Sequence, residues 1–72
     1  MSDNVFEWKM KKGSEFGYLV VNENSGKWTM GWSNENPQII QDIWYQGEDK
    51  DSGYSTFRDG IAQKLKEGFK AI

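Results

Sequence analysis

The chain has 72 residues, a net charge of −2 at pH 7, and neither cysteine nor histidine. These counts exclude a disulfide framework, a cysteine-based zinc site and the catalytic pairs that depend on cysteine or histidine. A chain this short builds one hydrophobic core, so we expect a single domain spanning residues 1–72. Because it has neither histidine nor cysteine, we expect that it is not an enzyme. The small net charge is also unlike the basic surface of a dedicated binder of duplex nucleic acid.

Three segments in the first half of the chain have the pattern of β-strands. Residues 4–11 alternate, with three large apolar side chains on one side. Residues 16–22 are rich in aromatic and β-branched types, and residues 27–33 alternate again. Short connections containing Gly13 and Gly26 separate the segments. The sequence therefore predicts a three-stranded antiparallel meander.

The apolar spacing changes after the single proline. Large apolar residues then recur at intervals typical of one side of a helix: Ile39, Ile40, Ile43 and Trp44. Asn36 fits the N-cap position, Pro37 the first helical position, and Gly47 the position after the last turn. These features predict a helix over residues 37–46. A fourth strand is the alternative, because isoleucine, tryptophan and tyrosine all favour strands.

Polar residues 48–55 predict a loop, followed by a helix over residues 56–71 that Thr56 or Ser55 can cap. Large apolar residues recur there every three or four positions: Phe57, Ile61, Leu65, Phe69 and Ile72. The expected fold class is α+β, a three-stranded antiparallel β-meander followed by two helices packed on one sheet face. The alternative is a four-stranded sheet plus one C-terminal helix.

The tryptophans of the predicted strands admit two interpretations. Trp28 and Trp32 lie in the stretch GKWTMGW and share one strand face, and Trp8 lies on the apolar face of the first segment. Exposed sheet aromatics can stack with nucleobases. However, two apolar helix stripes need an apolar sheet face to cover, and these are the faces available. We therefore interpret the three tryptophans as core.

The acidic stretch before the last helix does not match a calcium loop. Asp49 and Asp51 supply alternate oxygens, but a loop begun at Asp49 requires glycine at its sixth position and glutamate at its twelfth. Tyr54 and Gly60 stand at those positions. No glycine-rich phosphate loop occurs, and no carboxylate pair is placed in an apolar pocket. We expect no cofactor, no metal and no catalytic residue.

The best candidate for a binding surface lies around this acidic stretch. Tyrosine and tryptophan are the commonest binding anchors, and exposed carboxylates suit a basic partner. The expected partner-binding residues are Trp44, Tyr45, Glu48, Asp49, Asp51 and Tyr54. The sequence thus favours a non-enzymatic binding module that acts on a protein partner, as an accessory, adaptor or inhibitor. A homodimer formed through an open sheet face or edge strand is a third hypothesis, after the nucleic-acid-binding function given next.

The alternative function is a single-stranded nucleic-acid-binding domain that uses sheet aromatics together with four lysines: Lys9, Lys11, Lys12 and Lys27. It ranks second because three glutamates in the same part of the chain offset these lysines. The N-terminus lacks a signal-peptide pattern, and the longest apolar run is residues 19–21. We therefore expect a cytoplasmic protein that does not associate with membranes.

Overall fold

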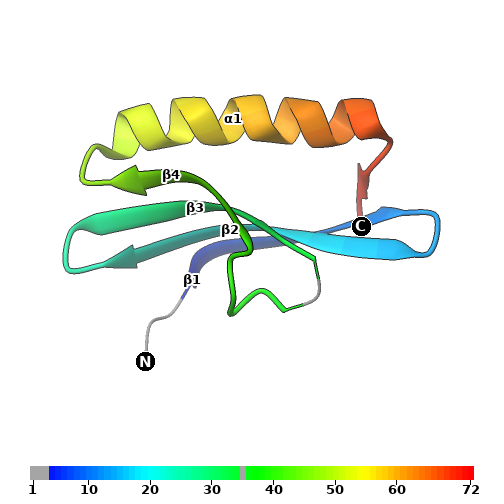
Figure 1. Ribbon diagram of the computed structural model, residues 1–72, viewed down its shortest axis with the longest axis horizontal. Helices are drawn as coiled ribbons and strands as arrows, with labels where there is room; N and C mark the ends of the chain where they lie inside the picture. Colours follow the sequence, from blue (N-terminus) through cyan, green and yellow to red (C-terminus); the bar gives the residue numbers. More distant parts are fainter. Residues whose placement is uncertain (1–3, 35) are drawn as a thin grey trace.

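A five-stranded antiparallel sheet with one helix on one of its faces makes up the fold (Figure 1). The computed structural model describes residues 4–34 and 36–72. The elements in chain order are β1 (Asn4–Lys12), β2 (Glu15–Asn24), β3 (Lys27–Ser33), β4 (Asp42–Gly47), α1 (Lys50–Glu67) and β5 (Lys70–Ala71). The strand order across the sheet is β4-β3-β2-β1-β5. The α+β class is therefore confirmed.

The predicted meander of β1, β2 and β3 is confirmed, with strand ends within two residues of those expected. Two-residue turns join the strands, and their backbones require the left-handed region: Gly13 has φ 60°, Ser25 φ 54° and Gly26 φ 82°. In the turn of Ser25 and Gly26 both central residues have positive φ, and in the turn of Gly13 and Ser14 only the first does. Both forms are typical of the tight turn whose twist matches that of the paired strands. These turns fix the register, so that Leu19 pairs with Trp8 on one side and Trp32 on the other.

The helix predicted over residues 37–46 is wrong. Asp42–Gly47 instead forms β4, which pairs with the free edge of β3, and the Asn36 side chain only accepts a hydrogen bond from the backbone of Gln38 in a local turn. The alternative of a four-stranded sheet with one C-terminal helix fits better, and the short β5 adds a fifth strand.

A β-bulge interrupts the alternation of side chains along β4. The register shifts between Met30 and Gly31, so that Tyr45 pairs with Met30, Ile43 pairs with Gly31, and Trp44 is the extra residue. Trp44 and Tyr45 consequently both reach the helix side of the sheet. The wrong prediction rested on the spacing of Ile39, Ile40, Ile43 and Trp44. Ile39 and Ile40 precede β4, and the bulge disrupts the alternation that would have marked Asp42–Gly47 as a strand.

The single helix starts and ends earlier than predicted. Asp49, not Thr56, is its N-cap, and its side chain accepts hydrogen bonds from the backbone nitrogens of Asp51 and Ser52. Most of the predicted loop over residues 48–55 is therefore the first helical turn and a half. At the other end Gly68, with φ 109°, terminates the helix. The chain then turns back, which lets β5 pair with β1 at Met10 and Lys11.

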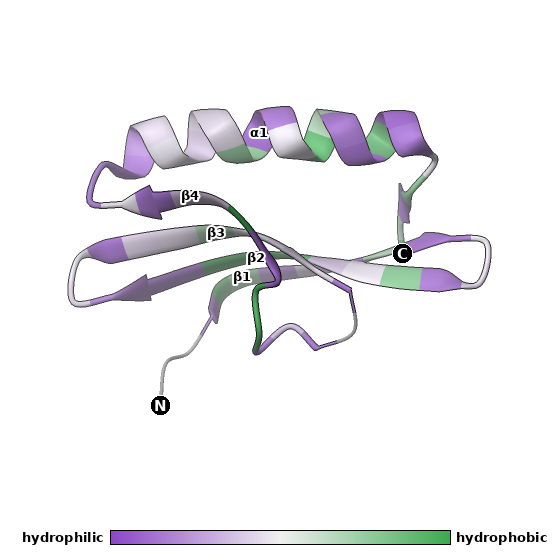
Figure 2. Ribbon diagram, in the orientation of Figure 1, coloured by the Kyte–Doolittle hydropathy of each residue, from purple (hydrophilic) through white to green (hydrophobic). Residues whose placement is uncertain are grey.

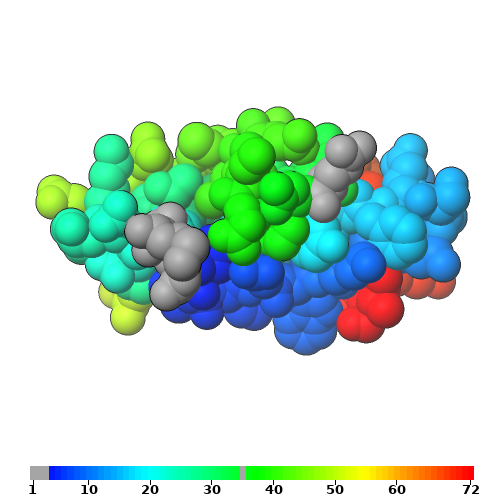
Figure 3. Space-filling model, turned by 90° about the horizontal axis from the view of Figure 1, so that it is seen from below, coloured from blue at the N-terminus to red at the C-terminus, as the bar shows by residue number. Residues whose placement is uncertain are grey.

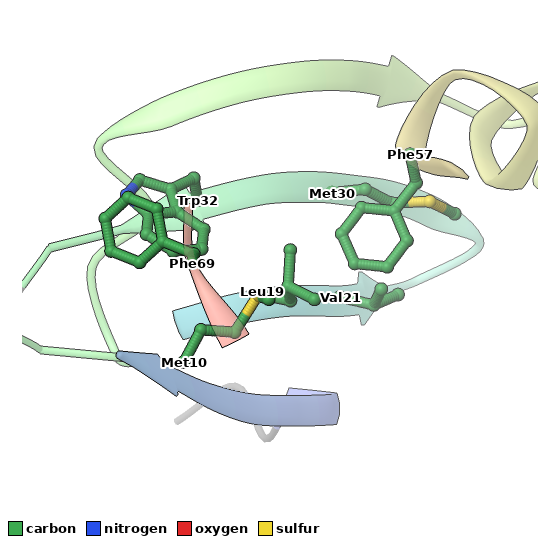
Figure 4. Close-up of a cluster of buried hydrophobic side chains, with 7 residues drawn as sticks. All are labelled: Met10, Leu19, Val21, Met30, Trp32, Phe57 and Phe69. Carbon is green, nitrogen blue, oxygen red and sulfur yellow. The ribbon is translucent and has the colours of Figure 1, made fainter. Parts of the chain in front are cut away.

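The core lies between α1 and the sheet (Figure 4). Its buried side chains come from β1, β2, β3, α1 and the residue before β5: Met10, Leu19, Val21, Met30, Trp32, Phe57 and Phe69. Trp32 is 1% exposed, so its assignment to the core is confirmed. Trp28 is half-buried, and Trp8 is 47% exposed. The expectation that Trp8 belongs to the buried core is wrong.

A connecting segment covers the middle of the opposite sheet face. Residues 36–41, between β3 and β4, fold back under the sheet, where the Asn4 side chain donates a hydrogen bond to the carbonyl of Pro37. The central Val20 is fully buried there, as is Ser33, whose hydroxyl donates to the carbonyl of Asn36. Figure 3 views this face and shows the segment in green over its centre, with the blue and cyan β1–β2 hairpin extending beyond it.

Candidate functional site

The aromatic residues of the predicted partner surface pack largely against α1. The ring of Trp44 lies 5.8 Å from that of Phe57 and beneath Gly60, where a methyl group would overlap it. Tyr45 lies beneath Gly53 in the same way, and its hydroxyl accepts a hydrogen bond of 3.0 Å from the backbone nitrogen of Asp49. Both side chains are half-buried, and both help to hold the helix on β4.

The acidic residues of the predicted surface gather around the first turn of α1. The hydroxyl of Ser52 donates to the Asp49 carboxylate at 2.9 Å, and this bond, with the backbone bonds of the cap, lowers the pKa of Asp49. Glu48 and Asp51 are exposed beside it. Negative charge at this end stabilises the helix dipole, so the cluster has a structural role that does not depend on a partner. Whether it also binds a partner stays a prediction.

A second surface, which the sequence prediction missed, lies along the side of α1 that faces β1. We call it the apolar strip, and it consists of Phe6, Trp8, Tyr54, Ile61 and Leu65. The helix lies mainly over β3 and β4, which leaves the helix side of β1 only partly covered: Met10 is buried there, but Trp8 is 47% exposed. One helix is about 10 Å wide, whereas four strands at about 4.8 Å spacing are nearly twice as wide, so one helix cannot cover them all.

Ring contacts join Phe6 to Trp8 and to the core, and helix geometry places Ile61 and Leu65 on the side of α1 towards β1. Phe6 lies 6.0 Å from Trp8 and 6.1 Å from Phe57, between ring centroids. Gly60 faces Trp44 on the β4 side of the helix, so Ile61 and Leu65, further round in the other direction, face β1. Leu65 is 55% exposed. Figure 2 shows apolar segments alternating with hydrophilic ones in the second half of α1, as expected of a helix with one apolar side.

A third surface lies on the opposite face of the sheet, at the β1–β2 hairpin. We call it the lysine face, and it consists of Lys9, Lys11, Phe16, Tyr18 and Lys70. The register pairs Lys9 with Tyr18, and Lys11 with both Phe16 and Lys70, so all five side chains lie on one side. The Nζ atoms of Lys9 and Lys11 lie 4.5 and 5.7 Å from the Phe16 ring centroid.

The structure divides the four lysines that the sequence analysis grouped. Lys9 and Lys11 share the lysine face, but Lys12 lies on the helix side, where its Nζ is 5.9 Å from the Phe69 ring centroid. Lys27 starts β3, at the other end of the sheet. The register also brings in Lys70, which the sequence analysis could not place because it assigned this residue to a helix.

Other classes of site are not seen among the described residues. No three side chains of the metal-binding types lie close enough to hold an ion within residues 4–34 and 36–72. Nor does the described part of the chain contain a helix long and apolar enough to cross a membrane. No protein-family model matches the chain, and neither does any curated protein or solved structure, so no relative supplies a function.

Proposed function

We propose that this chain is a non-enzymatic binding module that engages a protein partner through the apolar strip. The observation that carries the proposal is the exposure of Trp8 and Leu65, at 47% and 55%, on the same side of the fold as the core. A domain of this size needs most of its large apolar side chains inside to be stable. Leaving a tryptophan half outside therefore favours a role for it at an interface.

The energy available from covering the strip is large for so few residues. A tryptophan buries up to about 250 Å² of surface, so covering the exposed half of Trp8 removes roughly 100 Å² from water. At about 25 cal/mol per Å², this contributes about 2.5 kcal/mol, a typical value for a binding hot spot. Apolar patches bordered by polar residues are characteristic of protein-interaction sites.

Charge at one end of the strip indicates the kind of partner. Tyr54 joins the strip to the acidic start of α1, where Glu48, Asp49 and Asp51 lie. A partner with an apolar surface and a basic border is complementary to both features. Exposed charges of this kind mainly raise the association rate and contribute little to the stability of the fold.

The test uses a matched pair of exposed apolar residues. Ile43 is 52% exposed but lies on β4, outside the strip. The variants Leu65→Gln and Ile43→Gln should both fold, since each removes little buried surface. Proteins that co-purify with the wild type from cells of the source organism are identified and purified, and their affinity is then measured by calorimetry.

Leu65→Gln should weaken the affinity for a true partner at least tenfold, whereas Ile43→Gln should leave this affinity unchanged. Equal affinity of both variants for every purified partner would reject the strip as the interface. Sedimentation equilibrium of the wild type alone tests whether the partner is a second copy, because a dimer that Leu65→Gln abolishes would identify it as one.

A further inference from the structure

The lysine face concentrates positive charge, which Glu7, two residues before Lys9 on the same side of β1, offsets only in part. Lys11 and Lys70 are directly opposite each other on β1 and β5, and like charges in this position destabilise a strand pair. Among the described residues the one ion pair within 4.0 Å joins Lys64 to Glu67 on α1, and it includes no residue of the lysine face. Stability alone therefore does not explain the cluster, and an anionic ligand would relieve its repulsion.

Two aromatic rings lie among these lysines with the spacing of alternate strand residues. Phe16 is 42% exposed, and Tyr18 is half-buried beside it. Side chains two residues apart on a strand are separated by about 7 Å, roughly twice the 3.4 Å rise of stacked bases. An extended single strand, whose bases are separated from each other, can place successive bases on such rings.

An open cavity borders the same face. It has a volume of about 580 Å³ and lies where β2 continues beyond the last residue of β3. Four of its lining residues suit a nucleotide: Lys9 and Ser14 can contact a phosphate, and Phe16 and Tyr18 can stack with a base. The segment of residues 36–41 covers the centre of the sheet and leaves the hairpin beyond it open (Figure 3). The face is thus accessible to a long flexible ligand.

We propose that the lysine face binds single-stranded nucleic acid, with phosphates on Lys9, Lys11 and Lys70 and bases stacked on Phe16 and Tyr18. This function is separate from the protein interface, because the apolar strip lies on the other face of the sheet. An acidic peptide would satisfy the lysines, but its carboxylate side chains do not stack on aromatic rings. A duplex would satisfy the lysines but keeps its bases paired and out of reach. The single strand is the ligand that uses every element of the face.

The number of lysines fixes the expected strength and salt dependence. Three neutralised phosphates give a slope of about −2 for the logarithm of affinity against the logarithm of salt concentration. Raising the salt from about 50 to 200 mM should therefore weaken binding about twentyfold. Glu15 in the cavity lining opposes the lysines, so we expect moderate affinity even at low salt.

The experiment titrates a labelled twelve-nucleotide thymidine oligomer with the protein and follows fluorescence anisotropy at both salt concentrations. Phe16→Leu keeps an apolar side chain but removes the ring, and should weaken binding about tenfold. Lys11→Gln with Lys70→Gln should reduce the salt slope by about 1.4. The matched controls are Lys12→Gln, on the same hairpin but the other face, and Lys27→Gln, at the far end of the sheet. Both should bind like the wild type.

Each other outcome would overturn the proposal. One such outcome is no binding at the lower salt concentration. Another is a loss of affinity in Lys12→Gln or Lys27→Gln as large as in the variant of Lys11 and Lys70. A third is an affinity that Phe16→Leu leaves unchanged. Competition by poly-glutamate or by duplex of the same length as strongly as by the unlabelled single strand would show that charge alone is recognised. Leu65→Gln should retain oligonucleotide binding, which separates this result from the test of the protein interface. Unchanged circular dichroism and a melting temperature no lower than that of the wild type confirm that the variants fold.

Discussion

Replacing Gly17 by alanine should destabilise the fold, although alanine is the better strand residue. A methyl group on Gly17 would lie 1.9 Å from Cζ2 of Trp32, and two further ring atoms would lie within 2.6 Å. The ring cannot move aside easily. It is 1% exposed, its Nε1 donates a hydrogen bond of 2.9 Å to the side chain of Asn34, and Phe69 packs at 4.9 Å.

The magnitude follows from two opposing effects. Overpacking a core costs about 1–3 kcal/mol, and the closeness of three ring atoms favours the upper end. Replacing a glycine within a strand by alanine stabilises the fold by about 0.5–1 kcal/mol. The net loss should be about 2 kcal/mol, which lowers the melting temperature of a domain this small by about 8–16 °C.

The assay is urea unfolding followed by far-ultraviolet circular dichroism, because it does not depend on tryptophan fluorescence. The double variant Gly17→Ala/Trp32→Phe makes room for the methyl group. It should be less destabilised than the sum of the two single variants by about 1–2 kcal/mol. Additivity within about 0.5 kcal/mol, or a Gly17→Ala variant as stable as the wild type, would refute the packing described here.

Two further predictions concern the tryptophans and the helix cap. Trp32→Ala should cost about 3–5 kcal/mol of stability and leave the chain largely unfolded. Trp28→Ala, at a half-buried position, should cost about half as much and leave a folded domain in the same urea assay. A Trp28→Ala variant that is also unfolded would contradict its position at the margin of the core. Hydrogen bonds lower the pKa of the Asp49 carboxyl, so its charge stabilises the fold at pH values above the ordinary pKa of 3.8. This stabilisation is lost as the pH falls through the lowered pKa. Asp49→Asn keeps the cap but not the charge, so the excess melting temperature of the wild type over this variant should shrink between pH 6 and pH 2.5, and a constant difference would show that the charge is not stabilising.

The three strands of the meander could be predicted because local features specify them. Alternation marks the strands, and Gly13 and Gly26 mark turns that only a few residue types can form. The nature of residues 37–46 could not be predicted in the same way. The bulge at Trp44 is set by pairing with β3, and a pairing between distant segments leaves no local signal. The start of α1 was missed because its first turn and a half has few apolar residues, and Asp49 caps it through hydrogen bonds alone.

The candidate surfaces could be predicted only in part. Alternation shows which side of a strand Trp8 faces, but not how far a helix extends over that side, so its exposure could not be foreseen. The face of Tyr18 depends on strand register, which the turns settle only when their exact length is known. Lys70 joins the lysine face through a pairing with β1 that no local pattern indicates.

The short strand β5 has a consequence for the order in which the domain assembles. Every other strand pairs with its neighbour in the sequence, so three hairpins can form from local contacts. The pairing of β5 with β1 instead joins the two ends of the chain, after α1 has carried the backbone from the β4 edge of the sheet to the opposite edge (Figure 1). Closing so long a loop for two paired residues is entropically costly. We therefore expect this edge to close last during folding and to open first in the native state, which makes the neighbouring lysine face the most adaptable part of the sheet.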